Sequence, residues 1–298
     1  MKIAISGSSG LIGSRLIEYF SKEGHETTPI ARSSTPLKSN RKVIRWTIEQ
    51  GTVERDKLEG YDVVINLSGA NLAQRRWTNE YKKIMRESRL LSTEVLCENL
   101  AQLKNPPKVL FSASAVGYYG ASTAVDLKDE TSARGKGFLA DVCEAWERAT
   151  QPAAQKGIRV IHMRLGMVLS KKGGALSMML PIFKMGLGGR LGSGNQMISW
   201  IALEEIPHII HHIIQRSNIQ GPVNFVSPQC VTNGEFTKIL GEVIKRPTVF
   251  PVPAFAVRLL FGEMGDELLL NGASVVPVKL AESGYKFTYG DLKEALKT

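Results

Sequence analysis

Three glycines near the start restrict the fold of this chain more than any other feature. Gly7, Gly10 and Gly13 follow a short apolar run and precede a run with apolar residues at helical spacing. A strand, a tight glycine turn and a helix in this order are typical of a dinucleotide-binding unit. The glycines permit the turn, the approach of a pyrophosphate and close helix packing, while the helix amino terminus offers free N–H groups to phosphates. The alternative is a structural glycine-rich turn without a ligand.

Strand-like and helix-like runs alternate through most of the chain. The strand-like runs are 2–6, 27–31, 42–46, 62–67, 108–112 and 159–164. The helix-like runs are 11–23, 78–103 and 138–156. Such alternation indicates a parallel sheet with helices on both faces. The sequence therefore predicts an α/β fold with a Rossmann-type doubly wound parallel sheet.

The composition changes after Arg164, where a stretch rich in glycine and methionine begins. Helix-like runs at 203–216 and 233–245 and a strand-like run at 223–226 follow this stretch. We expect a Rossmann domain at residues 1–165, to which residues near 196–226 return. A smaller substrate lobe is expected at residues 166–298.

Charge and cysteine content restrict the partners and the cellular setting. The net charge of the 298 residues is +10, but the basic residues are scattered and no nucleic-acid-binding motif accompanies them. No apolar run is long enough for a membrane span, and no signal-peptide pattern is present. Three cysteines without CxxC spacing favour a reduced setting. We expect a cytoplasmic monomer or homodimer with a small-molecule substrate, without nucleic-acid or membrane binding.

No metal site is predicted. His208, His211 and His212 lie close together in the sequence. Carboxylate or thiolate ligands at a convincing spacing do not accompany them, so core or surface histidines are the better interpretation.

The end of the second strand-like run indicates which nicotinamide nucleotide binds. NAD-binding units carry an acidic residue there, which bonds the ribose 2′-hydroxyl. This chain instead has Arg32, followed by Ser33 and Ser34. A guanidinium with neighbouring hydroxyls suits a 2′-phosphate, so the sequence predicts NADP(H). The alternative is a solvent-exposed arginine without a ligand.

Further motifs carry a resemblance to a known family. They are NLSGAN at 66–71, SASAVGYYG at 112–120, FLADVCEAWE at 138–147, MRLGMVLSKKGGAL at 163–176, GLGGRLGSGNQMISWI at 186–201 and FGEMGDELLLNGASVVPVKLAESGYKF at 261–287. The chain resembles the extended short-chain dehydrogenases/reductases, and within them atypical NAD(P)-binding epimerase-family proteins. Those proteins end in a small C-terminal domain of unknown function, which would begin here at about residue 247.

The resemblance implies a set of cofactor-binding residues in the glycine loop, at the end of the second strand and after the fourth and fifth strands. They are Gly7, Ser9, Gly10, Leu11, Ile12, Gly13, Arg32, Leu67, Ser68, Gly69, Ala70 and Ser112.

The resemblance also implies that Ser114 bonds the substrate oxygen. Extended members carry a YxxxK motif on the next helix, with tyrosine as the proton donor. Leu139 and Cys143 occupy those two positions here. Any ketone reduction therefore needs another donor, and either Tyr118 or a bound water is predicted to supply the proton.

Several other residues are candidates for substrate binding, with packing as the alternative for each. Arg75, Arg76 and Trp77 would suit an anionic or aromatic molecule. The remaining candidates are Tyr119, Arg190, Ser199 and Trp200. The glycines of residues 186–194 predict either the hinge of a closing loop or a rigid turn.

Two functions from different classes agree with these features. The first is an NADP(H)-binding epimerase-family oxidoreductase or isomerase that acts on a small molecule, for which an anion is the candidate class. The alternative is a catalytically inactive NADP(H)-binding regulator that senses redox state, which the missing YxxxK residues favour.

Overall fold

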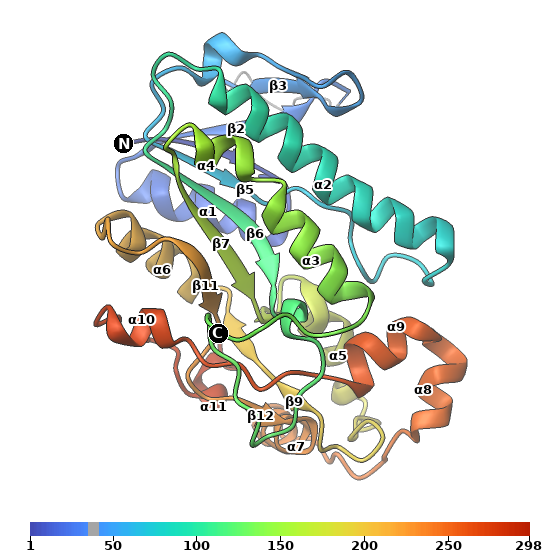
Figure 1. The fold of residues 1–298 in the computed structure, drawn as a ribbon. Helices are drawn as coiled ribbons and strands as arrows, with labels where there is room; N and C mark the ends of the chain where they lie inside the picture. Colours follow the sequence, from blue (N-terminus) through green and yellow to red (C-terminus); the bar gives the residue numbers. More distant parts are fainter. Residues whose placement is uncertain (35–41) are drawn as a thin grey trace.

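The computed structural model describes residues 1–34 and 42–298. Its central sheet has eight strands in the order β11-β7-β6-β5-β1-β2-β3-β4 (Figure 1). They are β1 (Lys2–Ser6), β2 (Glu26–Arg32), β3 (Ile44–Thr47), β4 (Thr52–Val53), β5 (Val63–Asn66), β6 (Val109–Ala115), β7 (Arg159–Leu165) and β11 (Gly221–Phe225). Only β3 and β4 pair in antiparallel register within this sheet. The strand order reverses between β1 and β5, and ligands of such sheets bind beyond the carboxyl ends at that point.

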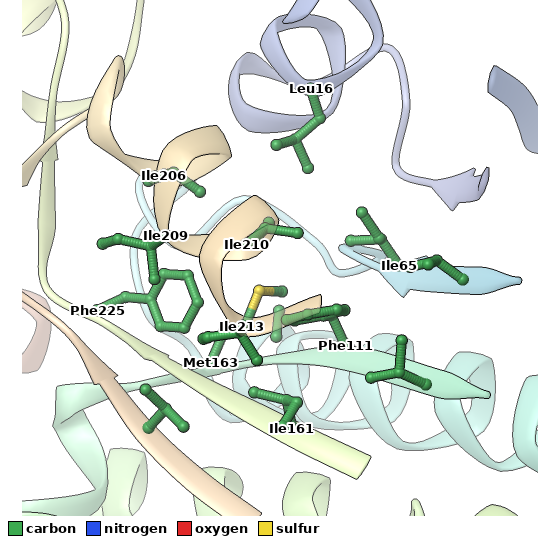
Figure 2. Close-up of a cluster of buried hydrophobic side chains, with 14 of the residues drawn as sticks. Leu16, Ile65, Phe111, Ile161, Met163, Ile206, Ile209, Ile210, Ile213 and Phe225 are labelled. Atoms are coloured by element: carbon green, nitrogen blue, oxygen red, sulfur yellow. The ribbon is translucent and has the colours of Figure 1, made fainter. Parts of the chain in front are cut away.

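Helices cover both faces of the sheet (Figure 1). One layer holds α1 (Leu11–Lys22) and α6 (Glu205–Ile214), and the other holds α2 (Asn79–Ala101), α3 (Phe138–Arg148) and α4 (Gln151–Gln155). Figure 2 shows four isoleucines of α6 directed towards Phe111, Met163 and Phe225 of the sheet. They are the fully buried Ile206, Ile209, Ile210 and Ile213. Their helical spacing forms the apolar face that buries α6. The predicted doubly wound α/β fold is confirmed.

The predicted helix 138–156 is two helices, α3 and α4. Pro152 lies in the first turn of α4, and it has no N–H to donate to the carbonyl oxygen of Arg148. The carbonyl oxygen of Glu147 accepts hydrogen bonds from the backbone N–H of Thr150 at 3.2 Å and from its hydroxyl at 2.7 Å, which holds the turn between the two helices. The prediction of one continuous helix was therefore wrong at this proline.

Short elements make up the region after β7. They are β8 (Met167–Leu169), α5 (Gly174–Lys184), β9 (Met197–Ile198), β10 (Trp200–Ala202), β12 (Val231–Thr232) and α7 (Asn233–Ile244). Strand β10 pairs with β8, and β12 pairs with β9, in two further small sheets. The sequence did not predict these strands, because two or three residues are too few to show a strand period.

The C-terminal segment packs against both the central sheet layer and the short elements that follow β7. Its elements are α8 (Ala254–Phe261), α9 (Glu263–Gly265), η4 (Asp266–Leu270), α10 (Val278–Glu282) and α11 (Leu292–Ala295). Leu280 of α10 is buried in the same core cluster as α6, while Leu292 of α11 packs in the cluster of Trp200 and Phe236. Short 3-10 turns lie at η1 (Ile48–Gln50), η2 (Arg55–Leu58) and η3 (Val116–Tyr119). Among the described helices, none has both the length and the apolar character needed to cross a membrane.

Candidate functional site

The glycine loop between β1 and α1 has no room for side chains at two of its three glycines. Gly7 has a φ of 64°, and a Cβ atom there would lie 2.8 Å from the carbonyl oxygen of Leu67. A Cβ atom on Gly13 would lie 2.3 Å from the carbonyl oxygen of Gly7. The loop therefore brings β1, α1 and the turn after β5 into backbone contact, which only glycine permits.

The amino terminus of α1 is left open for an anion. Gly10 is the N-cap and supplies no side-chain hydrogen bond, and the first amide of α1 with a helical partner is that of Ser14, bonded to the carbonyl oxygen of Gly10 at 2.9 Å. The N–H groups of Leu11, Ile12 and Gly13 therefore have no acceptor within the helix. Ser9 is exposed in the same loop. These residues fit the pyrophosphate of a dinucleotide.

Arg32 lies at the carboxyl end of β2, on the same edge of the sheet. Its side chain is exposed and forms no hydrogen bond or ion pair with the described residues. Arg45 donates to the carbonyl oxygen of Arg32 at 2.8 Å, and the hydroxyl of Ser33 donates to the carbonyl oxygen of Trp46 at 3.0 Å. The guanidinium of Arg45 and the hydroxyl of Ser33 thus lie at the backbone of the strand ends where a 2′-phosphate was predicted.

Buried hydrogen bonds hold the turn at 67–70 beside the glycine loop. The hydroxyl of Ser6 donates to Asn66 at 2.6 Å, Asn66 donates to Thr93 at 2.8 Å, and Ser68 donates to Ser6 at 3.0 Å. Leu67, Ser68 and Ala70 are half-buried and Gly69 is exposed. The turn lies at the reversal of strand order, as expected for a residue set that contacts the dinucleotide.

Ser112 does not reach this surface. It is only 1% exposed, and its hydroxyl has no hydrogen-bond partner among the described residues. The structure therefore does not support a direct cofactor contact by Ser112.

Ser114 belongs to a buried network at the carboxyl end of β6. Its hydroxyl donates to the Glu147 carboxylate of α3 at 2.7 Å. The guanidinium of Arg164 on β7 donates to both oxygens of that carboxylate, at 2.8 and 2.9 Å. Bidentate arginine–carboxylate pairs fix geometry well, so Glu147 and Arg164 together hold the Ser114 hydroxyl in place. Ser114 itself is 2% exposed.

The two tyrosines of η3 differ in environment. Tyr118 is half-buried, and the guanidinium carbon of Arg164 lies 3.5 Å from the centre of its ring. Tyr119 is fully buried, accepts a hydrogen bond from Arg164 at 2.9 Å and donates one to Asn224 at 2.7 Å. Burial raises the pKa of Tyr119 to about 12. Tyr119 is thus a structural residue rather than the predicted substrate contact, while Tyr118 remains available.

Leu139 and Cys143 face η3 from α3. A Cβ atom on Gly117 would lie 3.2 Å from the Cβ of Leu139 and 3.9 Å from the sulfur of Cys143. Burial raises the pKa of Cys143 to about 11. Neither an aliphatic side chain nor a thiol with so high a pKa supplies a proton readily at neutral pH.

Three predicted substrate residues are buried in the protein. Trp77 packs on Phe138 and donates its indole N–H to the carbonyl oxygen of Leu72 at 2.8 Å. The hydroxyl of Ser199 links the carbonyl oxygen of Ala273 and the amide of Val275, at 2.7 and 2.9 Å. Trp200 is 0% exposed. Other parts of the protein enclose each of these side chains, and the structure does not support a substrate wall built from them.

The two neighbouring arginines remain at the surface. Arg75 and Arg76 are both exposed, and Arg76 donates to the carbonyl oxygen of Leu259 at 3.3 Å. Arg76 therefore links the residues before α2 to α8, and Arg75 remains a candidate for an anionic ligand.

The loop at 186–194 is a packed turn. The amide of Gly192 donates to the carbonyl oxygen of Val252, and that of Val252 donates to the carbonyl oxygen of Arg190, both at 2.9 Å. The guanidinium of Arg190 is exposed and forms no hydrogen bond or ion pair with any other described residue. Of the two predicted alternatives, these contacts favour the rigid turn over the hinge, while a ligand-binding role of Arg190 stays a prediction.

We expect Gly189→Ala to destabilise the protein by about 1–3 kcal/mol, as overpacking typically does. A Cβ atom on Gly189 would lie 1.8 Å from the carbonyl oxygen of Phe250, so the backbone must move. Gly234→Ala is the matched control, because its nearest non-neighbouring atom would lie at 3.4 Å. Urea denaturation measures both variants, and an unchanged Gly189→Ala protein would argue for a mobile loop.

Glu147, Arg164 and Asn224 belong to the buried network but were not predicted as site residues from the sequence. Arg164 and Asn224 lie in apolar strand-like runs. A charged or amide side chain within an apolar strand is a usable signal, because such groups are buried only with partners.

His162 lies next to Glu147 in the buried network of Ser114 and Arg164, and it makes the stability of the protein depend on pH. Burial lowers its pKa, Arg164 and Lys279 lower it further, and Glu147 at 3.8 Å opposes them. As pH falls below about 6.5, the unfolded chain gains a proton that folded His162 resists, so stability is lost. We expect denaturation at about pH 7.5 and pH 5.5 to show a smaller difference for His162→Gln than for the wild type. One such site changes the free energy of unfolding by at most about 1.4 kcal/mol per pH unit. Equal pH dependence of stability in His162→Gln and the wild type would contradict this role of His162.

The described residues contain no group of three or more His, Cys, Asp or Glu side chains that could hold a metal ion. Tyr19 separates His208 from His211, since its hydroxyl lies 3.4 Å from the first and 3.2 Å from the second. His212 instead lies 2.8 Å from the hydroxyl of Ser283.

A doubly wound sheet with a glycine loop at the reversal of strand order defines a dinucleotide-binding protein of the Rossmann class. The chain belongs to the NAD dependent epimerase/dehydratase family, which matches residues 3–226, and a domain of unknown function, DUF1731, matches residues 252–298. The predicted family is confirmed. The second match begins near the boundary expected at about residue 247.

Similar proteins extend over the whole chain. The epimerase family protein Mb2239 of Mycobacterium bovis is 44% identical over 294 residues, which cover 99% of this chain and 96% of that protein. The crystal structure of human epimerase family protein SDR39U1 with NADPH has a TM-score of 0.89 and 31% identity, and covers 100% of this chain and 98% of the human one. A nucleoside-diphosphate sugar epimerase from Corynebacterium glutamicum has a TM-score of 0.79 and 32% identity, over 99% of this chain and 57% of that one. The prediction of a nicotinamide nucleotide as the cofactor class is confirmed by the family and by the human homologue.

Proposed function

We propose that this chain binds NADP(H) and acts as an oxidoreductase or isomerase of the epimerase family on a small, oxygen-bearing molecule. The observation that carries the proposal is the open glycine loop together with Arg32 at the end of β2. The loop fits a pyrophosphate, and the exposed guanidinium fits a 2′-phosphate. The NADPH in the human homologue supports the same cofactor.

Residues of the chain itself would bind the reacting oxygen of the substrate and transfer its proton. When bound, NADP(H) supplies or accepts the hydride. Ser114 already donates its proton to Glu147, so its lone pairs could accept a hydrogen bond from a substrate hydroxyl if binding opens the surroundings of this residue, which is 2% exposed. Tyr118 is half-buried, lies four residues after Ser114 and stacks its ring on Arg164, and it is proposed as the proton donor. To polarise a carbonyl, the Ser114 hydroxyl must first turn away from Glu147.

The partner and setting proposed for this activity follow from composition and surface charge. The exposed side chain of Arg75 favours a small anionic substrate. Cys97, Cys143 and Cys230 are free thiols, which favours a reducing cytoplasm. The active species is proposed to be a monomer or a homodimer.

Hydride exchange tests the proposed activity directly. The purified protein is incubated with deuterium-labelled NADPH and a panel of small carbonyl compounds, and separately with NADP+ and a panel of small alcohols that carry the deuterium on the hydroxyl-bearing carbon. Transfer of the label in either direction supports an enzyme. A protein that binds NADPH but transfers no label would favour the redox-sensing regulator. The apolar Leu139 and the buried Cys143 at the two motif positions support that alternative.

Cofactor preference provides a separate prediction. We expect NADPH to bind about 5- to 150-fold more tightly than NADH, because a charge-assisted bond to phosphate contributes about 1–3 kcal/mol. Arg32→Ala should remove most of that difference. Arg148→Ala is the control, since Arg148 is 68% exposed on α3 and forms a surface pair with Glu144. Fluorescence titration measures each affinity, and equal binding of both cofactors to the wild type would contradict the role of Arg32.

A further inference from the structure

Arg89 on α2 is a buried cation without an acidic partner among the described residues. Its exposed fraction is 9%. Its guanidinium donates to the carbonyl oxygen of Met85, one turn earlier in α2, at 2.9 Å and to that of Ala70 at 3.0 Å. Burial lowers the pKa of Arg89, which shows that its surroundings disfavour the charge. A guanidinium has five N–H donors, so three of them remain for another acceptor.

Two other arginines that are buried or half-buried have their charge or donors satisfied. Arg164 faces the Glu147 carboxylate through two hydrogen bonds. Arg159 donates to three carbonyl oxygens at the end of α6, those of Ile213, Arg216 and Ile219. Retention of an uncompensated charge at Arg89 costs stability. That cost indicates a ligand-binding role more than a structural one.

The position of Arg89 indicates which ligand would use it. A Cβ atom on Gly69 would lie 3.1 Å from the Cγ of Arg89, so the side chain lies directly against the turn at 67–70. This turn contacts the glycine loop through Leu67 and Gly7. On its other side, the guanidinium lies 5.1 Å from the centre of the Trp146 ring, and its charge acts on the Cys143 thiol. Arg89 therefore lies between the dinucleotide turn and the position where a YxxxK lysine would stand.

We propose that Arg89 contacts the nicotinamide half of bound NADP(H), with its free N–H groups as donors to ribose hydroxyl oxygens. The cation at this place then comes from α2 instead of α3. This inference rests on the proposed NADP(H) site. It adds to that site a residue outside the phosphate loop and outside the 2′-phosphate pocket.

A comparison of two ligands distinguishes contacts with the adenosine half of the cofactor from contacts with its nicotinamide half. NADPH contains both halves, whereas adenosine 2′,5′-bisphosphate lacks the nicotinamide and its ribose. Arg89→Met keeps the length of the side chain and removes the charge. We expect it to weaken NADPH binding about 10- to 100-fold, the range of a hydrogen bond to a charged group. Binding of the bisphosphate should be unchanged, and Arg89→Lys should recover part of the NADPH affinity.

Controls decide between a ligand role and a structural one. Arg86→Met is the matched variant, because Arg86 is exposed on the same helix, and it should bind both ligands as the wild type does. The melting temperature of unliganded Arg89→Met should equal or exceed that of the wild type, since an unpaired charge is removed. Equal weakening of both ligands with a lower melting temperature would overturn the proposal in favour of a structural role. Unchanged NADPH binding would overturn it too. Failure of the wild type to bind either ligand would instead reject the NADP(H) site itself.

Discussion

Replacement of Arg164 by methionine is expected to destabilise the folded protein by about 3–5 kcal/mol, because it breaks a buried ion pair on one side only. The Arg164 side chain is 3% exposed and that of Glu147 is 10% exposed. Without the guanidinium, the Glu147 carboxylate keeps a hydrogen bond from Ser114 but loses two charge-assisted bonds. Tyr119 also loses one of its partners. Urea denaturation, followed by circular dichroism, measures the loss.

Two control variants test whether the buried charge is the cause. Arg164→Met combined with Glu147→Met removes both charges, and the double variant should recover much of the stability. Arg258→Met breaks a pair of the same 2.8 Å length whose side chains are 56% and 41% exposed. Exposed pairs contribute about 0–1 kcal/mol, so this variant should resemble the wild type. A double variant as unstable as the single one would show that the shape of the site, and not its charge, determines the loss.

Backbone requirements determine the glycine loop on the cofactor side of the site, and such requirements can be predicted from the sequence. Gly7 and Gly13 lie where any side chain would collide with backbone atoms, and such needs appear in the sequence as glycines between a strand and a helix. Arg32 was predicted for a similar reason, since its place at the end of β2 follows from strand order alone. Local sequence therefore carried both predictions.

The substrate side was predicted poorly because long-range packing determines it. Trp77, Tyr119, Ser199 and Trp200 were expected at a pocket wall, and all four are buried by elements distant in sequence. Ser199, for example, is fixed by Ala273 and Val275, more than 70 residues later. An aromatic or hydroxyl side chain has the same local pattern whether a ligand or the C-terminal segment covers it. Only the fold of that segment distinguishes the two.

Tyr118 and Tyr119 are adjacent in the sequence, and local sequence could not predict which of them is buried. Both tyrosines follow β6, and the sequence allowed either to bind substrate. Burial and two hydrogen bonds assign Tyr119 to the core, while Tyr118 stays half-buried over Arg164. Variants that remove one hydroxyl or the other are therefore expected to affect different properties, turnover for Tyr118 and stability for Tyr119.

With a substrate from the hydride-exchange screen, Tyr118→Phe should lower turnover about 10²- to 10⁴-fold, the usual contribution of a general acid. The ring remains to stack on Arg164, so stability and NADPH affinity should change little. Tyr119→Phe is the matched control. It removes a hydroxyl bonded to Arg164 and Asn224, so it should lower the free energy of unfolding by about 1–3 kcal/mol and leave the proton donor intact.

Ser114→Ala should impair turnover as well, since Ser114 is proposed to orient the reacting oxygen beside Glu147. Full turnover of Tyr118→Phe would remove Tyr118 from the mechanism and leave a bound water as the donor. Full turnover of Ser114→Ala would exclude the whole arrangement, because no other described hydroxyl joins the end of β6 to the Glu147 carboxylate.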